Sequence, residues 1–338
     1  MSVADPATVA PPRRRLEVAT IWLCRLYLLG LLTAWALLTL LGDRWWPVTV
    51  LLYLPRWGFA LPLLVVLPLA LWQRRERVVL LASVVILLLP VMGLCLPWRT
   101  AFAGSGAALK VRLVTLNIDR TDLRDSAFEA FLQETDPDVV ACQDWSSAHD
   151  HGLFQGPGWH RQRNGQFYLA SRFPIAETEH VTRPQVVFDR MTRYRLETPS
   201  GPLTLFNLRL KTPREGLLEV RHHGWNGAAE LEKNSEQRRT QSEILSRWIQ
   251  QAEGRVLVAG DFNTLPDSTI WSDYWANFTD AWTQAGAGFG HTYRNKRTAL
   301  RIDHQLAGPG WQCTRCWLGP PVGSEHLPLV AEWEWVGE

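Results

Sequence analysis

The chain has 338 residues and a net charge of +2, which is enough for one large domain and an appended segment. Residues 1–100 carry ten basic and four acidic residues, whereas residues 101–338 carry 25 basic and 29 acidic ones. Proteins that bind nucleic acid without sequence preference usually carry surplus Lys and Arg to meet the phosphate charge. The net acidic charge of the longer part therefore argues against nucleic acid as its partner.

Residues 16–98 are dominated by Leu, Val, Ala and Trp and predict a membrane anchor. Each apolar stretch approaches the ~20 residues that cross the hydrocarbon of a bilayer. The residues before the anchor (1–15) are expected to be disordered, and residues 99–108 are expected to form a linker. The anchor is predicted to have three membrane-spanning helices: Ile21–Leu41, Leu51–Trp72 and Val78–Trp98.

Arginines flank the three predicted spans unequally. Three of them precede the first span, and three more lie between the second and third, at positions 74, 75 and 77. The connection between the first two spans has only Arg44, which Asp43 offsets. The positive-inside rule then places the N-terminus in the cytoplasm and everything after the third span outside, on a multi-pass protein of the cell (inner) membrane. A cleaved signal peptide is the alternative, and three successive apolar stretches argue against it.

Residues 109–338 have the pattern of a mixed α/β domain. Helices are predicted at Leu123–Glu134 and Ser235–Gln251. Short apolar or alternating runs predict strands at Lys110–Asn117, Asp138–Gln143, Phe167–Ala170, Arg190–Glu197, Leu203–Leu210, Arg255–Gly260, Arg301–Leu306 and Leu329–Trp335. This order predicts an α+β fold in which two sheets pack face to face with helices outside, a four-layer α/β/β/α sandwich.

Polar side chains close or flank several of these predicted strands. Gly260-Asp261-Phe262-Asn263 follows an apolar run, and Asn117 and Gln143-Asp144 end two earlier strands. Asp303 and Ser324-Glu325-His326 come later in the chain. Side chains at such positions are expected to converge on one edge of the sandwich. A carboxylate and a carboxamide two residues apart suit a site that grips a phosphate and its metal ion, which predicts a phosphoesterase.

The roles follow from the residue types. His326 is the candidate base, because histidine titrates near ~6.5, and Asp303 would hold its other nitrogen. Asp261 would orient the nucleophile or assist the leaving group. Asn263 and Arg209, with Asn117, would hold phosphoryl oxygens through hydrogen bonds. The expected ion is Mg²⁺ or Mn²⁺, which favour oxygen ligands, and its expected ligands are Asp144, Asn117 and Glu325.

These clusters resemble the endonuclease/exonuclease/phosphatase superfamily, whose fold is shared by pancreatic-type DNases, abasic-site endonucleases, sphingomyelinases and inositol-polyphosphate 5-phosphatases. Asn117 matches its first-strand asparagine, and Gly260–Asn263 matches its Gly-Asp-Phe-Asn motif. Asp303 matches the aspartate of its Ile-Asp motif, and His326 the histidine of its terminal Ser-Asp-His. The resemblance extends from Leu109 to Trp335. It implies the DNase I-like sandwich.

The sequence departs from the family pattern at three positions. Asp144 stands where the family has a glutamate, and Glu325 where it has an aspartate. Arg209 stands where a strand histidine is expected. Carboxylates of either length ligate hard cations, so the first two changes can re-seat an ion. Arginine cannot donate a proton, but its forked donors can stabilise charge on a phosphoryl oxygen.

The predicted topology suggests a phosphate carried by a lipid as the substrate, since the domain is tethered close to the bilayer. The architecture also resembles a small bacterial group of membrane-anchored members linked to teicoplanin resistance, and by that resemblance the substrate is an isoprenyl-pyrophosphate carrier of cell-wall synthesis. Two alternatives remain open. The chain is a tethered extracellular nuclease, or a domain that has lost catalysis and binds a lipid headgroup.

Two further groups of residues leave their interpretation open. Cys313 and Cys316 are expected to form a small disulfide outside the cytoplasm, with free thiols as the alternative. Asn234, Arg238 and Gln241 have the spacing of one helix face and recur at this spacing in membrane-anchored members of the superfamily. A solvated helix face is an equally good interpretation of these three residues.

Overall fold

The computed structural model describes residues 12–97, 109–119, 123, 125–149, 153–180, 190–296 and 298–337. The chain divides into two compact units. The first contains residues up to Leu37 together with Pro55–Leu94, and the second contains Leu38–Leu54 together with the chain from Cys95 onward. The expected linker at 99–108 lies outside the described residues. A short segment of the predicted anchor, Leu38–Leu54, thus belongs to the second unit.

The first unit is helical. Its helix α1 (Pro12–Leu41) contains a stretch, Arg14–Leu41, that is long and apolar enough to cross a membrane. Cys24 and Leu31 of α1 are buried against the other helices of this unit. These are η1 (Arg56–Ala60), α3 (Leu63–Trp72), η2 (Arg74–Glu76), α4 (Arg77–Ile86) and the π-helix η3 (Leu87–Val91). Since α1 already begins at Pro12, the expected disorder up to residue 15 is not observed over its last four residues.

Three uniform spans are not confirmed. Within the described residues, α1 alone is a single helix long enough to cross a bilayer. The second predicted span is interrupted, because α2 (Trp46–Tyr53) ends just before Pro55, a residue that lacks the N–H needed to continue a helix. In place of the third predicted span, α4 and η3 together reach only Val91.

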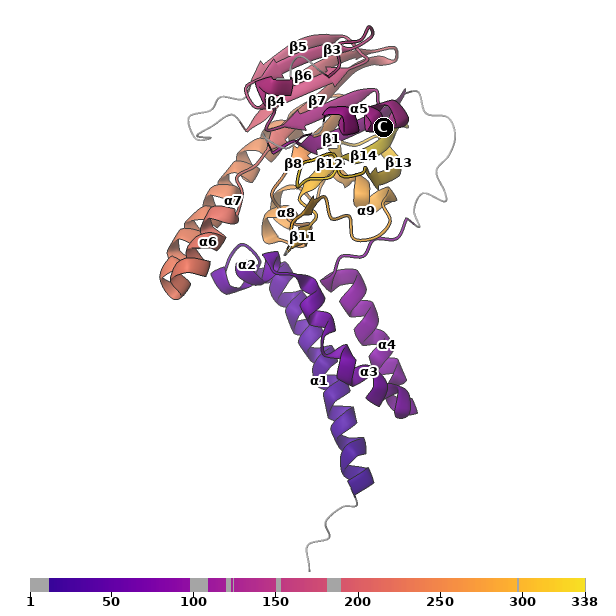
Figure 1. Cartoon of the computed structure of the whole chain (residues 1–338), viewed down its shortest axis with the longest axis vertical. Helices are drawn as coiled ribbons and strands as arrows, with labels where there is room; N and C mark the ends of the chain where they lie inside the picture. The colour runs from indigo at the N-terminus through magenta and orange to yellow at the C-terminus, as the bar shows by residue number, and fades with distance from the viewer. Residues whose placement is uncertain are drawn as a thin grey trace, which may run out of the picture. The chain divides into compact units, whose positions relative to one another are not determined.

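The second unit contains two six-stranded sheets (Figure 1). The first sheet has the order β13-β14-β1-β2-β4-β3, with β13 (Trp311–Leu318), β14 (Leu329–Trp335), β1 (Leu109–Asn117), β2 (Val139–Gln143), β4 (Phe167–Ser171) and β3 (His160–Asn164). The second has the order β5-β6-β7-β8-β12-β9, with β5 (Ile175–His180), β6 (Met191–Thr198), β7 (Gly201–Arg209), β8 (Arg255–Asp261), β12 (Asp303–Ala307) and β9 (Thr279–Asp280). A separate short hairpin joins β10 (Tyr293–Arg294) to β11 (Ala299–Leu300).

Each sheet has one parallel pair of strands at its centre. β1 runs parallel to β2, and β7 runs parallel to β8. In these registers Asn117 lies opposite Gln143, and Arg209 lies opposite Asp261. Asp303, the first residue of the antiparallel strand β12, lies opposite Asp261 on its other side. The pairing therefore brings most of the polar strand ends picked out in the sequence to the ends of the central strands.

Buried apolar side chains show how the layers pack. Leu113 and Leu257 belong to the core between the two sheets. The neighbouring Val114 points to the opposite face of the first sheet, as alternation along a strand requires, and packs against Phe128 of α5 (Asp125–Thr135). On the outer face of the second sheet Val258 packs with residues of α7 (Ala228–Gln250), including Leu245 and Ile249. The order helix, sheet, sheet, helix is that of the predicted sandwich.

Helix α6 (Arg214–His223) of the second unit is among the helices absent from the sequence prediction. Residues 213–234, for which the sequence analysis names no helix or strand, contain α6, η6 (Gly224–Gly227) and the first turns of α7. Figure 1 shows α6 and α7 side by side. Gly216 permits this close packing, because a Cβ there would lie 2.8 Å from the Cα of Leu231. The sequence of α6 is mostly polar, so its pattern does not indicate a helix.

Cys313 and Cys316 are free thiols, so the expected disulfide is wrong. Both lie in β13, where a register shift between Cys313 and Arg315 turns both side chains into the core between the sheets. The Sγ of Cys313 donates to the carbonyl of Arg315 at 3.3 Å. Burial raises the pKa of Cys316 well above its ordinary value, which keeps this thiol protonated.

Candidate active site

Asp261 ends β8 in a tightly constrained turn. Gly260 before it has a φ of 148°, and a Cβ at this position would lie 1.9 Å from the carbonyl oxygen of Leu208. Only glycine can stand there without displacing β7. After Asp261 the chain turns through Asn263, which has a φ of 49°. The Asn263 N–H donates to Asp261 Oδ1 at 2.9 Å, and its side-chain amide donates to Asp261 Oδ2 at 2.8 Å.

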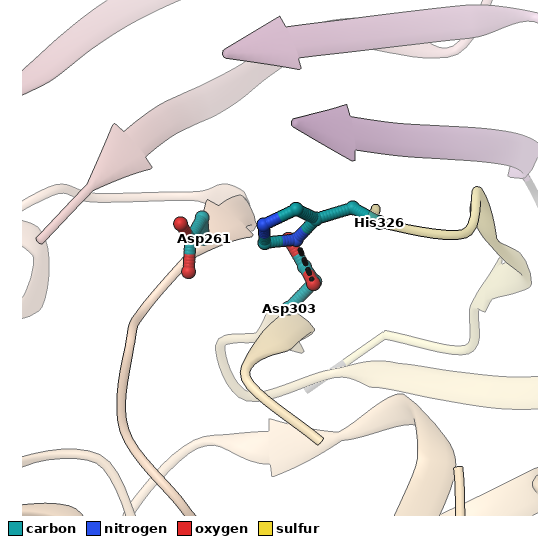
Figure 2. A group of neighbouring side chains, drawn as sticks. All are labelled: Asp261, Asp303 and His326. Atoms are coloured by element: carbon teal, nitrogen blue, oxygen red, sulfur yellow. Dashed lines mark hydrogen bonds and ion pairs between the residues drawn. The ribbon is translucent and has the colours of Figure 1, made fainter. Parts of the chain in front are cut away.

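His326 and Asp303 form a buried pair beside Asp261. The Nδ1 of His326 lies 2.8 Å from Oδ2 of Asp303. Figure 2 shows the imidazole ring with one nitrogen bonded to Asp303 and its other nitrogen toward Asp261. One ligand-type atom from each of the three residues lies within 4.8 Å of the other two. The geometry therefore brings these three sequence-predicted residues into one cluster.

The main chain around this pair is fixed by two hydroxyl groups. The His326 N–H donates to Ser324 Oγ at 2.9 Å, and Ser324 Oγ donates to the carbonyl of Asn117 at 2.7 Å. The N–H of Asp303 donates to Oγ1 of Thr292 at 3.0 Å. The ring of Tyr293 packs edge-on against His326, with 5.0 Å between ring centroids. His326 is therefore held in one orientation by its backbone, by its ring partner and by an aromatic neighbour.

The buried charges shift each other's protonation. Burial lowers the pKa of His326, but the charge and hydrogen bond of Asp303 outweigh it and raise this pKa from 6.5 to about 9. Burial raises the pKa of Asp261 from 3.8 to about 6, and the charge of Asp303 adds to this, while His326 and Arg209 oppose it. At neutral pH His326 is therefore an imidazolium and Asp261 is mostly ionised.

Asn117 connects the first sheet to this cluster. Its side-chain amide donates to Asp261 Oδ2 at 3.0 Å, and its Oδ1 accepts the N–H of Asp119 at 3.0 Å. Asp119 has a φ of 51° and lines a cavity together with Asp261 and His326. Burial raises the pKa of Asp119, and the charges of Glu325 and Asp144 raise it further, while His326 and Arg209 lower it. Burial and the charges of two neighbouring carboxylates thus disfavour the charged form of Asp119.

Arg209 and Asp144 are direct partners. A terminal nitrogen of Arg209 lies 2.7 Å from Oδ2 of Asp144, and the other terminal nitrogen donates to Gln166 at 3.4 Å. Two of the three departures from the family pattern therefore face each other. A guanidinium bonded to a carboxylate is firmly placed. The third, Glu325, accepts a hydrogen bond from the hydroxyl of Tyr293 at 2.8 Å.

The donor set suits a hard divalent cation. Asp303 Oδ1 is buried without a hydrogen-bond partner among the described residues. The pKa of Asp119 stays raised although the charges of His326 and Arg209 lower it. Oxygen-rich groups of carboxylates with an asparagine carbonyl are the ligands that Mg²⁺ and Mn²⁺ prefer. Asp144 would share its charge between such an ion and Arg209.

Other residues of the site were given no role by the sequence analysis, although Gln143 was among its polar strand ends. Gln143 and Asn207 join the two sheets beneath the site through a hydrogen bond of 2.7 Å, and both side chains are buried. Thr292 lies in a segment with no strand pattern. Asp119, two residues after Asn117, is the one that its polarity and position could have revealed. His304, next to Asp303, points away from the site to the carbonyl of Thr264 and to Asp280, as strand alternation requires.

A cavity of about 440 Å³ opens onto the cluster. Its wall combines the polar residues above with two arginines of α6 and a set of apolar side chains. The apolar and aromatic part consists of Tyr53, Pro213, Leu217, Leu218, Tyr293, Leu300 and Ile302. The polar part consists of Asn117, Asp119, Arg209, Thr212, Arg214, Arg221, Asp261, Asn263, Asn295, Thr298, Glu325 and His326.

The arrangement of these strand ends agrees with a comparison with protein families. The model described as the Endonuclease/Exonuclease/phosphatase family matches residues 114–326, which is more than half of the chain. The chain belongs to this family. Members of the endonuclease/exonuclease/phosphatase family are hydrolases of phosphoester bonds and generally depend on a divalent metal ion. The finer resemblance, to membrane-anchored members of the family, is not confirmed by the comparison.

Solved structures share the fold at low sequence identity. TDP2 of D. rerio carrying 14 humanizing mutations superposes with a TM-score of 0.53 at 18% identity, over 67% of this chain and 99% of that chain. The 3'-5' exonuclease NExo of Neisseria meningitidis gives 0.52 at 16%, over 66% and 100%. A family member from Bacteroides vulgatus gives 0.51 at 16%, over 67% and 99%. No curated protein sequence matches the chain.

Proposed function

We propose that the protein is a membrane-anchored, metal-dependent phosphoesterase that hydrolyses a phosphate or pyrophosphate ester carried by a lipid. The observation that carries the proposal is the meeting of Asp261, Asp303 and His326 in one buried cluster, two of whose members, Asp261 and His326, line a cavity. These groups can handle a proton and a developing negative charge at the same place. A surface that only bound a headgroup would not need a histidine held by a buried carboxylate.

The pKa values of His326 and Asp261 suggest which of them donates a proton and which accepts one. His326, which the sequence analysis assigned as the base, is charged at neutral pH and is better placed to donate to a phosphoryl oxygen. Asp261, with a pKa of about 6, is ionised at neutral pH and can accept a proton from the attacking water. The water oxygen bonds to phosphorus, and the ester P–O bond breaks with its electron pair on the leaving oxygen. Asp303 holds Nδ1 of the ring and supports the imidazolium.

The ion that the family generally requires would be held by Asn117, Asp144 and Glu325, with Asp119 beside them. When bound, such a cation offsets charge on the phosphoryl and leaving oxygens. Arg209 would donate hydrogen bonds toward the same oxygens. Asn263, which the sequence analysis also assigned to the phosphoryl oxygens, instead uses its side-chain amide to bond Asp261 and the carbonyl of Leu210. Because Arg209 is tied to Asp144, its guanidinium stays in place while the substrate enters.

The cavity wall supports an amphiphilic substrate. Leu217 and Leu218 of α6 and Leu300 line it beside the carboxylate cluster, while Arg214 and Arg221 flank the two leucines on the same helix. An apolar group attached to a phosphate could contact the leucines, and a second phosphate could be met by the arginines. The apolar α1 supports anchoring, and the arginine distribution in the sequence supports an extracytoplasmic site.

A nuclease is the second candidate. Among the structures that share the fold, TDP2 of D. rerio has been solved in complex with a single-stranded DNA product, at 17% identity and a TM-score of 0.51. NExo is described as a 3'-5' exonuclease. The net acidic charge of residues 101–338 does not favour a polyanion as large as DNA.

The test uses the full-length protein in detergent with Mg²⁺, before and after EDTA. A polyprenyl diphosphate, a generic phosphodiester, a phosphomonoester and single-stranded DNA are offered separately. We expect turnover of the polyprenyl diphosphate, lost with EDTA, and a loss of about 10²–10⁴-fold in His326→Ala and Asp261→Ala. His160→Ala, on the exposed strand β3, is the matched control and should keep wild-type turnover.

Turnover of DNA without turnover of the diphosphate would replace the proposal by the nuclease. A folded protein that hydrolyses none of the four substrates would instead be the headgroup-binding module. Full activity in either Ala variant would remove that residue from the mechanism.

A further inference from the structure

The corner between α1 and α2 contributes to the second unit although it is far from the catalytic residues in sequence. α1 ends at Leu41, and α2 begins at Trp46, so the corner contains Asp43. Asp43 is separated by 195 residues from Arg238 of α7, yet the two side chains lie 2.6 Å apart. The hydroxyl of Thr269, in the second sheet's outer helix α8 (Thr269–Tyr274), donates to the carbonyl of Gly42.

Asp43 and Arg238 form a buried ion pair. Their side chains are 0% and 1% exposed. Removal of either partner would leave the other as an uncompensated buried charge, which destabilises a fold strongly. Asp43 also has a φ of 60°, which lies in the left-handed region that few residues other than glycine adopt. The solvated helix face that was open as an interpretation of Arg238 is therefore excluded, and Asn234 and Gln241 are buried as well.

Arg238, which Asp43 holds in place, also bonds the turn Asp261–Asn263. Its Nη2 donates to the carbonyl of Asn263 at 2.8 Å and to the hydroxyl of Tyr53 at 2.5 Å. The Tyr53 hydroxyl itself donates to the same Asn263 carbonyl at 3.2 Å. Two donors thus converge on one carbonyl oxygen, and both belong to residues tied to the α1–α2 corner.

Asn263 is the residue that sets the direction of Asp261. Its left-handed backbone lets the backbone N–H and the side-chain amide bond both carboxylate oxygens of Asp261 at once. Its side-chain amide also donates to the carbonyl of Leu210 at 3.0 Å. The peptide after Asn263 must stay in place for these bonds to persist, and Arg238 and Tyr53 hold that peptide.

We propose that Arg238 and Tyr53 are positioning residues for the turn Asp261–Asn263, and that the α1–α2 corner is therefore a working part of the active site. Asp43 fixes Arg238, and Arg238 with Tyr53 fixes the Asn263 carbonyl. Tyr53 also contributes its ring to the wall of the cavity. Of the two measurements that test these roles, turnover rests on the proposed function, whereas amide hydrogen exchange does not.

The test separates positioning from simple stability. In the full-length protein, Asp43→Asn and Arg238→Gln each leave one buried group without its charged partner, whereas the double variant removes both charges. We expect each single variant to lower the Tm, and the double variant to recover most of it. Turnover in the double variant should stay low, by about 10- to 100-fold in kcat with a smaller change in KM, because the Asn263 carbonyl has lost its charged donor.

The second readout does not depend on turnover. Amide hydrogen exchange over the segment 261–264 should rise in the double variant and, to a smaller extent, in Tyr53→Phe, which removes one hydroxyl and keeps the ring. Arg44→Gln is the matched control: Arg44 is next to Asp43, but among the described residues its side chain forms an exposed ion pair, with Asp273 at 2.9 Å. It should leave both the exchange and kcat unchanged.

Wild-type exchange over 261–264 in both the double variant and Tyr53→Phe would overturn the inference. Wild-type kcat in the double variant would overturn it equally. If the wild-type protein hydrolyses no phosphoester, the proposed function fails and the exchange result alone decides this inference. If the variants with altered charge do not fold, Tyr53→Phe decides it.

Discussion

At the scale of single residues, the protonation of His326 depends on one carboxylate. The folded-state pKa of about 9 exceeds the ordinary 6.5, so the pair with Asp303 stabilises the fold fully below pH 6.5. This contribution is lost as the pH rises through 9. The same shift keeps the ring charged at the pH where Asp261 is ionised, which is the combination that the proposed mechanism uses.

The first prediction concerns this titration. In EDTA-treated protein, the ring signals of His326 should titrate near pH 9 by NMR. Asp303→Asn should lower that pKa toward or below 6.5, because burial alone favours the neutral ring. Asp273→Asn, at an exposed carboxylate, should leave the titration unchanged. A His326 that titrates near 6.5 in the wild-type protein would contradict the assigned charge.

At the scale of secondary-structure elements, the pairing of β7 with β8 places the catalytic turn. Arg209 and Asp261 end the two strands side by side, and Gly260 makes the close approach possible. The strand order brings Asp303 to the other side of Asp261. The site is thus assembled by register, and a shift of one residue would turn each of these side chains to the opposite face.

The second prediction follows from this close approach. Gly260→Ala should lower the free energy of unfolding by about 3 kcal/mol or more, because backbone atoms of β7 must move and the left-handed φ adds strain. Gly308→Ala is the matched control at the end of β12, where the nearest atom to a Cβ would be 3.5 Å away and no unusual φ is required. Thermal unfolding of both variants measures the difference. Equal unfolding temperatures would show that β7 and β8 are not packed this closely.

At the scale of the whole molecule, the cavity brings together groups from both sheets, from α6 and, through Tyr53, from the end of α2. Carboxylates from different elements approach one another there at a cost in electrostatic repulsion. A bound cation would remove that cost, so the ion and the folded chain should stabilise each other.

The third prediction measures this linkage. Mg²⁺ at about 100 times its Kd should stabilise the full-length protein by about 2.7 kcal/mol, which corresponds to a rise of roughly 5–10 °C in Tm. Asp144→Asn and Glu325→Gln should each reduce the rise. Glu332→Gln, in an ion pair with Arg112 between β1 and β14, should not. An Mg²⁺-independent Tm in the wild-type protein would argue against a resident ion.

The sequence by itself determined the sandwich and the set of strand-end residues. Strand alternation and polar strand ends are local patterns, so Asp261, Asp303 and His326 could be chosen without coordinates. A local pattern gave a wrong prediction where strand pairing decided the direction of the side chains. The pair Cys313 and Cys316 suggested a disulfide, but a register shift directs both thiols into the core.

Only the tertiary structure decided which groups are partners. The bond between Arg209 and Asp144 joins strand ends of different sheets, and that between Arg238 and Asp43 spans most of the chain. No periodicity in the sequence encodes such contacts, because they arise when separately formed elements pack. The assignment of Leu38–Leu54 to the second unit has the same origin. Its apolar residues suggested membrane-spanning segments, whereas its polar contacts through Asp43 and Tyr53 lead to the catalytic turn.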